Sequence, residues 1–150
     1  MSVDRSFIEA NRGSLDRMRI FVEAATDDDL RTEMPAGWTV AAVLGHLAFW
    51  DQRVQVVLDM VEEGVKPPPY DEGSVDWIND TAKRFLLAME PRALTRLALD
   101  IATRTDDRVA HLSDEVLDEA TQRWFTERRC DDRNEHLDEI EQALAGRPSR

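Results

Sequence analysis

The stretch TVAAVLGHLAFWDQRVQVVLDMVEEG, residues 39–64, predicts a long amphipathic helix. Thr39 is placed to cap this helix, because its hydroxyl can accept a hydrogen bond from a free backbone amide of the first turn, and Gly64 ends it. Apolar residues recur at helical spacing along one side, so that side should face a core. The inward positions that we expect are Val43, Leu47, Val54, Leu58 and Val61.

Helical patterns also flank this stretch on both sides. The first covers residues 4–25, the third covers residues 75–111, and the last covers residues 121–144 after a link over residues 113–120. Pro91 interrupts the third pattern and is expected to kink or break it, because proline cannot donate the backbone hydrogen bond. The inward positions that we expect on the first helix are Phe7, Leu15, Met18, Val22 and Ala25.

No strand pattern is present, so the sequence predicts an all-α fold, a single four-helix-bundle domain over residues 1–150. The connection over residues 64–74 contains KPPPY, residues 66–70, which should stay extended. About eleven extended residues reach roughly 35 Å, close to the length of a helix of about 23 residues, so helices two and three could run parallel. On the third helix we expect inward positions at Trp77, Phe85, Leu94, Leu97, Ile101 and Val109.

The composition limits the partners that the protein can have. With 31 acidic and 19 basic side chains, the formal net charge is -12, which should repel both nucleic acids and anionic membrane surfaces. The longest apolar run, residues 39–50, is shorter than the ~20 residues of a membrane-spanning helix. The N-terminus lacks a signal-peptide pattern, and the lone Cys130 cannot form an internal disulfide. We therefore expect a cytoplasmic protein.

Two of the three histidines suggest a site. His46 lies in the first two turns of the helix predicted over residues 39–63, and His136 follows Asp132 by four residues in the last helix. That spacing places Asp132 and His136 on one face, about one turn apart. We expect this face to point inward, because it continues through the apolar residues Phe125, Ile140 and Leu144.

A carboxylate on a core-facing stripe needs a hydrogen bond, an ion pair or a bound cation. Two ligands on one helix and a histidine from a neighbour could hold a divalent ion and leave positions open for water or substrate. His46, Asp132 and His136 would suit Zn, Ni, Fe or Mn, and the sequence does not choose among these metals. The structural alternative is that Asp132 hydrogen-bonds His136 or pairs with Arg128 or Arg129.

The remaining reactive side chains favour structural roles. His111 lies at the end of the third helix, where a histidine interacts favourably with the helix dipole. Cys130 lies on a different face from His136, so we interpret it as a small packing residue. A Ser-His-Asp order, a Gly-rich phosphate loop and a paired-cysteine metal motif are absent from the sequence, which argues against those enzyme classes.

Several short segments resemble the DinB-like superfamily. GWTV at residues 37–40, followed by LGHL at residues 44–47, is similar to the tryptophan and hydroxyl cap that introduce helix two and its histidine in that family. WIN at residues 77–79 and DRNEHLDEI at residues 132–140 are similar to the later landmarks. The likeness extends over residues 5–144.

This resemblance implies a four-helix bundle with an up-down-down-up connection and a metal site of three histidines, one on helix two and two on helix four. His46 and His136 match two of these positions, and Asp132 stands at the third, where a carboxylate could preserve metal binding or record a lost site. Related groups include bacillithiol- and mycothiol-dependent transferases and the maleylpyruvate isomerase N-terminal domains. The resemblance therefore implies a homodimeric, metal-dependent enzyme, a thiol-dependent transferase or hydrolase acting on a small reactive molecule. The alternative is a non-catalytic stress or small-ligand-binding bundle whose metal site is degenerate.

Overall fold

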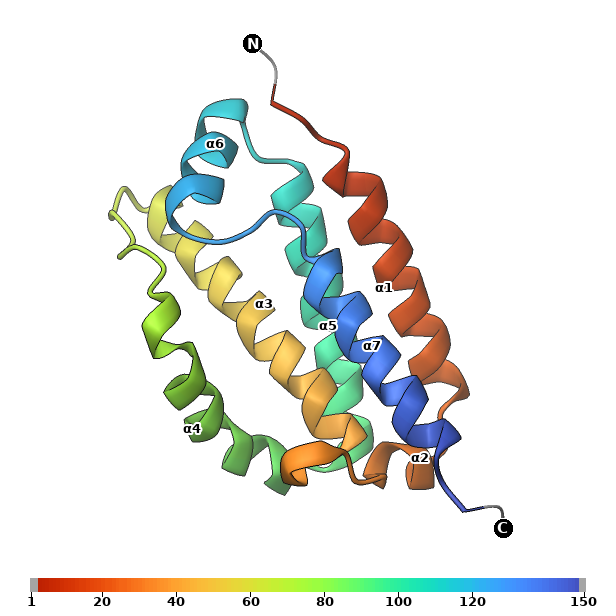
Figure 1. Ribbon diagram of the computed structural model, residues 1–150. Coiled ribbons are helices and arrows are strands. Elements are labelled where there is room, and N and C mark those ends of the chain that lie inside the picture. The colour runs from red at the N-terminus through yellow and green to blue at the C-terminus, as the bar shows by residue number, and fades with distance from the viewer. Residues whose placement is uncertain (1–2, 149–150) are drawn as a thin grey trace.

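The computed structural model describes residues 3–148 as an all-helical chain. Figure 1 shows the helices α1 (Phe7–Ala24), α2 (Asp27–Arg31), α3 (Val40–Glu62), α4 (Val75–Ala88), α5 (Pro91–Ala110), α6 (Asp114–Arg123) and α7 (Cys130–Ala145). Short 3-10 turns occupy Pro35–Gly37 and Glu72–Ser74. Within residues 3–148, extended pairing is limited to one isolated bridge between Glu33 and Thr39. The all-α prediction is confirmed, and no helix in this part of the chain is long and apolar enough to cross a membrane.

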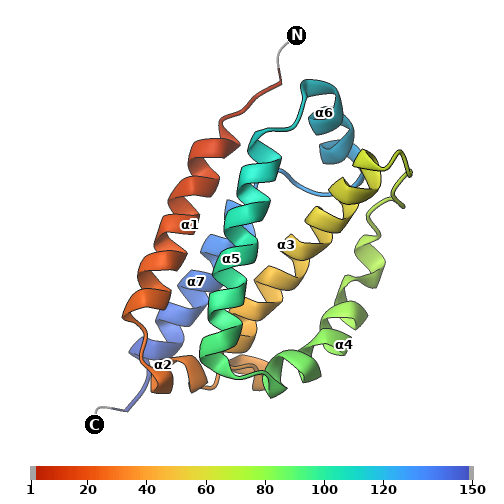
Figure 2. The same cartoon turned by 180° about the vertical axis from the view of Figure 1, so that it is seen from behind.

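The long helices α1, α3, α5 and α7 pack together as a bundle in which α1 and α7 run one way and α3 and α5 run the other (Figures 1 and 2). Side-chain contacts between α3 and α5 also show that these two helices run in the same direction. Gln55 of α3 donates a hydrogen bond to the Thr105 hydroxyl of α5 at 3.0 Å, while Gly45, earlier on α3, faces Leu94, earlier on α5. The second and third long helices of the bundle are therefore parallel.

The chain returns from the end of α3 to the start of α5 through α4, not through the Pro-rich connection (Figure 2). The prediction of one interrupted helix over residues 75–111 is wrong, because α4 and α5 run in opposite directions. Pro91 occupies the first position of α5, where its missing amide hydrogen costs nothing. Glu90 caps α5, because its carboxylate accepts hydrogen bonds from the next two backbone amides at 3.0 and 2.6 Å.

The prediction of one helix over residues 121–144 is also wrong, since α6 ends before Trp124 and α7 begins at Cys130. Trp124 and Phe125 are both buried in the connection between the two helices. Successive residues on a helix point about 100° apart, so two adjacent large aromatic rings could not both face the same core from a helix. Leaving the helix allows both rings to be buried.

The predicted inward faces of the first two long helices are confirmed. On α1 and just after it, Phe7, Leu15, Met18, Val22 and Ala25 are buried, and on α3 so are Val43, Leu47, Val54 and Leu58. Val61 is half-buried. On the third predicted helix, Leu94 and Val109 are buried and Ile101 is half-buried, whereas Trp77, Phe85 and Leu97 are exposed by 61%, 71% and 44%. The inward prediction is wrong for these three residues.

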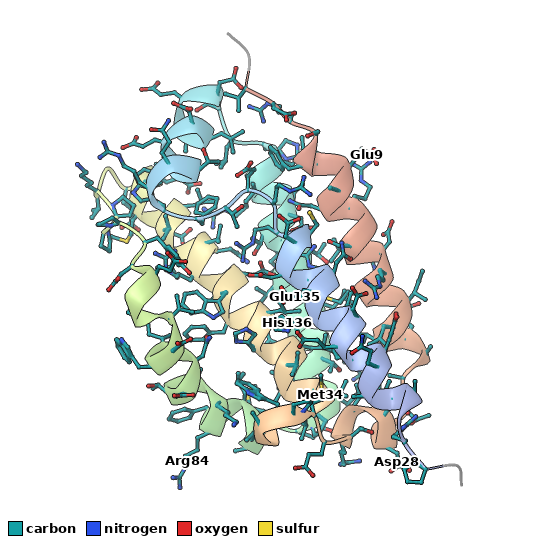
Figure 3. The ribbon with its side chains drawn as sticks, viewed as in Figure 1. Glu9, Asp28, Met34, Arg84, Glu135 and His136 are labelled. Carbon is teal, nitrogen blue, oxygen red and sulfur yellow. The ribbon has the colours of Figure 1, made fainter. Side chains whose placement is uncertain are left out.

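Helix α4 is exposed because it packs on the outside of the bundle, mainly along α3. Its one buried side chain is Leu86, which packs with Ala42 and Leu94. Gly45 allows this close approach, since a Cβ atom there would lie 2.9 Å from the side chains of Leu86 and Leu94. Arg84, on the opposite side of α4, points away from the bundle (Figure 3).

A buried charge cluster joins the four long helices, and we define it as Asp51, Asp106, Arg129 and Arg133. Arg133 of α7 is 1% exposed and donates to the Asp106 carboxylate at 2.9 and 3.0 Å. It also donates to the Ser14 hydroxyl of α1 at 2.9 Å. Asp51 of α3 is 3% exposed and accepts a hydrogen bond from Arg129 at 2.9 Å. This cluster fixes the face of α7 that points into the bundle.

Candidate functional site

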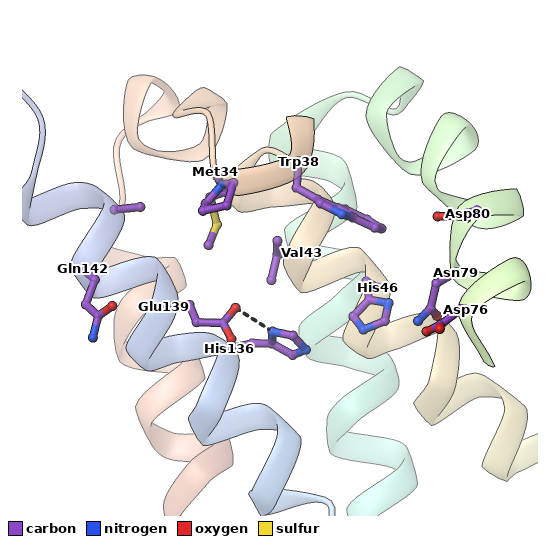
Figure 4. A pocket seen from close by; sticks show the side chains of 12 residues that line it. Met34, Trp38, Val43, His46, Asp76, Asn79, Asp80, His136, Glu139 and Gln142 are labelled. Carbon is purple, nitrogen blue, oxygen red and sulfur yellow. Dashed lines mark hydrogen bonds and ion pairs between the residues drawn. The ribbon is translucent and has the colours of Figure 1, made fainter. Parts of the chain in front are cut away.

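A pocket of about 930 Å³ opens between α3, α4 and α7, beside the loop that precedes α3. Figure 4 shows the side chains of its wall, with the two predicted histidines facing each other. Three carboxylates also line the pocket, which favours a bound cation. The polar and aromatic groups of the wall include Trp38, His46, Asp76, Asp80, His136 and Glu139.

The centre of this pocket is a histidine pair, His46 and His136. The two ring centroids lie 5.2 Å apart, and the ring planes are nearly perpendicular at 89°. On its other side His46 contacts the Trp38 ring edge to face, with a centroid distance of 5.6 Å. The antiparallel packing of α3 against α7 therefore brings together two residues that are far apart in the sequence.

Glu139 orients His136. The Nδ1 atom of His136 lies 3.2 Å from a carboxylate oxygen of Glu139, one turn later on α7 (Figure 4). A protonated Nδ1 would donate to this carboxylate and leave Nε2 as the ring nitrogen with a free lone pair. A carboxylate on the second nitrogen is the usual companion of a metal-bound histidine, because it fixes the ring and its tautomer.

His46 is held in its neutral form. Burial, and to a lesser degree the neighbouring His136, lower the pKa of His46 from 6.5 to about 4, against the opposing effects of Asp132 and Glu139. A neutral imidazole retains the lone pair that a metal ion requires. At neutral pH, the environment of His46 therefore favours the neutral imidazole, which can bind a metal ion, over the protonated imidazolium.

This lowered pKa predicts a pH-dependent stability of the metal-free protein. The unfolded chain binds the His46 proton near pH 6.5 and the folded chain binds it only near pH 4, so the contribution of His46 is complete above pH 6.5. As the pH falls from 6.5 to 4, we expect this group to lower the free energy of unfolding by up to about 3 kcal/mol. Urea unfolding at several pH values measures the loss, and His46→Gln should flatten the curve. An identical pH dependence in the parent and His46→Gln would contradict this expectation.

The third predicted site residue, Asp132, is exposed, and the prediction that it shares a core-facing stripe with His136 is wrong. Ile140 is buried, the His136 side chain is 24% exposed, and Asp132 lies outside. Four residues on a helix turn about 400°, which is about 40° more than a full turn. From Ile140 to His136, and again from His136 to Asp132, the side chain therefore points about 40° farther from the core. The stripe that faces the core contains Cys130, Arg133, Leu137 and Ile140.

Asp132 nevertheless lies beside His46. It lines a small gap of about 20 Å³ together with His46, Trp50 and Arg129. The structural alternative of a polar pair is not observed, since Asp132 has no hydrogen bond or ion pair within residues 3–148; Arg129 binds Asp51 instead. In the same range no group of three histidine, cysteine, aspartate or glutamate side chains is close enough to hold a metal ion. The structure therefore brings His46 and His136 together and leaves Asp132 at the edge.

The other reactive residues have the structural positions that the sequence predicts. Cys130 is buried at the start of α7, and burial, followed by its contact with Asp131, raises the pKa of its thiol. His111 caps the end of α5 and is exposed, with Nδ1 lying 2.7 Å from the carbonyl oxygen of Asp107. Neither residue lines the 930 Å³ pocket that contains the histidine pair.

Sequence reasoning missed two parts of this region. Glu139 could have been found, because it follows His136 by one helical turn and a carboxylate at that spacing can reach the ring. The buried charge cluster could not, because Asp51 and Asp106 read as ordinary polar positions on amphipathic helices. Only the packing of the helices shows that these carboxylates converge on Arg133.

The four long helices, with the histidine pair between α3 and α7, define a DinB-like helical bundle. The chain belongs to the family described as the mycothiol maleylpyruvate isomerase N-terminal domain, whose sequence profile matches residues 12–145. This match confirms the resemblance to the DinB-like superfamily. No curated protein and no solved structure matches the chain significantly.

Proposed function

We propose that this protein is a metal-dependent enzyme that holds a divalent ion through His46, Asp132 and His136. The ion is Zn, Ni, Fe or Mn, all of which accept imidazole and carboxylate ligands. The proposed reaction is a transfer or hydrolysis on a small reactive molecule, with a thiol as the second reactant. Membership of a family named for mycothiol supports the thiol.

The observation that carries this proposal is the histidine pair. Two imidazoles on antiparallel helices face each other at 5.2 Å, and one of them stays neutral because of its burial. Two partly buried imidazoles side by side are costly without polar partners, and a cation would interact favourably with both rings and with the carboxylates of the pocket.

Asp132 fits as the third ligand through a change of rotamer. Its carboxylate lines the gap beside His46, and within residues 3–148 it makes no hydrogen bond or ion pair that such a change would break. Because Asp132 is exposed, a rotation of its side chain would disrupt little packing. Its negative charge already acts on His46, opposing the lowering of the His46 pKa.

A divalent ion in this site would supply a nucleophile near neutral pH by lowering the pKa of a bound water or thiol. The chain itself orients and shields the site. Glu139 fixes the ring of His136, Trp38 covers one side of His46, and Asp76 and Asp80 of α4 line the opposite wall. The exposed α4 forms the side of the pocket through which a small molecule would enter.

The second candidate is a non-catalytic, small-ligand-binding bundle. The position of Asp132 favours it, because the three predicted ligands do not converge within the described residues. In that case the 930 Å³ pocket would bind an organic molecule between Trp38 and the histidine pair, without a metal.

Metal content separates the two candidates. Protein purified without an affinity tag or chelator is expected to contain about one equivalent of a divalent transition metal, because the site offers one set of ligands. Elemental analysis measures the content, and titration of the chelated protein with Zn or Ni measures uptake. Less than about a tenth of an equivalent together with no uptake on titration would reject the enzyme and favour the ligand-binding bundle.

A further inference from the structure

A second pocket, of about 360 Å³, lies on the other side of Asp132 from the histidine pair. Its wall combines the middle of α3 with Tyr70 of the Pro-rich connection and with the segment from the end of α6 to the start of α7, which lie near one another in Figure 1. Three arginines line it, Arg53, Arg123 and Arg129. We call it the arginine pocket.

This concentration of positive charge is unusual in a chain with a net charge of -12. Arg129 is neutralised by Asp51 at 2.9 Å, but Arg53 and Arg123 have no carboxylate partner within residues 3–148. Arg53 is half-buried, and burial and the nearby Arg129 lower the pKa of its guanidinium group. A partly desolvated guanidinium group without a counter-charge is costly, so the pocket favours an anion.

The chain holds these groups in place before any ligand arrives. Arg53 donates a hydrogen bond to the carbonyl oxygen of Trp124 at 2.8 Å and lies over the Tyr70 ring at 5.3 Å from its centroid. The backbone amide of Tyr70 donates to the carbonyl oxygen of Arg123 at 2.8 Å, which ties the Pro-rich connection to the end of α6. A preformed pocket loses less entropy when it binds a ligand.

The aromatic rings in the pocket wall favour a particular shape for the uncharged part of the ligand. Trp50 and Tyr70 meet at 6.4 Å between centroids, and the buried Trp124 lies in the same wall. The Trp50 indole is fixed by a hydrogen bond from its Nε1 to Asn79 of α4 at 2.7 Å. Flat rings at the sides of a guanidinium cluster favour a planar, unsaturated group over a compact, fully hydrated ion.

The charge balance selects the anion itself. The three arginines are balanced by two carboxylates, Asp132 in the same lining and Asp51 as the partner of Arg129, which leaves a local charge of about one positive unit in the pocket. A singly charged carboxylate matches this balance, and its two oxygens suit the paired donors of a guanidinium group. A doubly charged phosphate would carry more negative charge than the pocket can neutralise, and Asp132 would repel it.

We propose that the arginine pocket binds the carboxylate of a small, planar organic monoanion and directs the rest of that molecule past Trp50 and Asp132 toward His46. Trp50, Arg129 and Asp132 line both the arginine pocket and the gap beside His46, so one ligand can contact both regions. This inference names a substrate class and, for the orientation of the ligand, rests on the proposed function. The anion pocket itself requires no metal.

The test is an NMR titration of the full-length, metal-free protein with benzoate. Four tryptophans give four indole signals, which Trp→Phe variants assign. We expect the Trp50 and Trp124 signals to shift and saturate with benzoate, while the exposed Trp77 signal stays unchanged. The neutral isostere benzamide should leave all four signals in place, and inorganic phosphate should shift them only at much higher concentration.

Substitutions locate the binding site. Arg123→Gln, at an exposed position, and Arg53→Lys, which keeps the charge but loses the guanidinium geometry, should each weaken benzoate binding by about tenfold or more. The control is Arg96→Gln, which removes the same charge from an exposed arginine on α5 that has no ion pair within residues 3–148, and this variant should bind benzoate as the parent does.

Three outcomes overturn this inference: no saturable shift with benzoate, an equal response to benzamide, or unchanged binding in both pocket variants. Phosphate binding that is tighter than benzoate binding would assign the pocket to a different anion and would also reject it. The proposed metal site is tested separately by metal uptake. Benzoate binding in a protein that takes up no metal would support the arginine pocket and reject the enzyme, and the reverse result would reject the pocket alone.

Discussion

Arg133→Leu is expected to lower the free energy of unfolding by about 3–5 kcal/mol, the range for removing one partner from a buried ion pair. Arg133 is 1% exposed and is the group through which α1, α5 and α7 are joined by charged hydrogen bonds. Its loss would leave the Asp106 carboxylate buried without its main partner. Burial already raises the pKa of Asp106 even with Arg133 present.

Urea unfolding at neutral pH measures this effect, and a matched control lies five residues earlier in the sequence. Arg128 pairs with Asp131 at the surface, with a distance of 3.0 Å, so Arg128→Leu should cost less than about 1 kcal/mol. Asp106→Leu in the Arg133→Leu background should restore part of the lost stability, because the double variant no longer contains the unpaired carboxylate. A loss below about 1 kcal/mol for Arg133→Leu would mean that water or another group compensates Asp106.

The parts of the fold that the sequence predicts correctly are those that local chemistry determines. Thr39 caps α3 as expected, its hydroxyl accepting a hydrogen bond from the Ala42 amide at 3.1 Å, and the inward positions of α1 and α3 follow the helical period. The errors lie where packing overrides a continuous pattern. Pro91 starts a new helix instead of kinking one, and Trp124 and Phe125 leave the helix so that both can be buried.

The candidate site divides in the same way. His46 and His136 could be paired because each position matched a family landmark, and the antiparallel packing of α3 and α7 brings the rings together. The prediction for Asp132 failed because it treated a spacing of four residues as a full turn, whereas four residues exceed one turn by about 40° and the difference accumulates. The arginine pocket is formed by three separate segments, and no local pattern in the sequence connects them.

Asp132→Ala is expected to weaken binding of Zn or Ni by at least about 10–100-fold, since losing a ligand should cost no less than losing an outer partner of one. His46→Ala should weaken it further, because it removes half of the histidine pair. Asp132→His should keep or strengthen binding, because imidazole is favourable for both metals and the spacing from His136 is unchanged. Metal titration of the chelated variants measures all three effects.

The stability of the same variants shows whether Asp132 acts through the metal alone. Asp132 is exposed and makes no hydrogen bond or ion pair within residues 3–148, so Asp132→Ala should change the free energy of unfolding of the metal-free protein by no more than about 0.5 kcal/mol. Exposed Glu135→Ala on the same helix is the control for the loss of one negative charge, because Glu135 likewise makes no hydrogen bond or ion pair within residues 3–148. If Asp132→Ala binds metal as tightly as the parent does while His46→Ala does not, the third ligand must be another carboxylate of the pocket. Glu139 would then be the group to replace next, because it already contacts His136 at 3.2 Å.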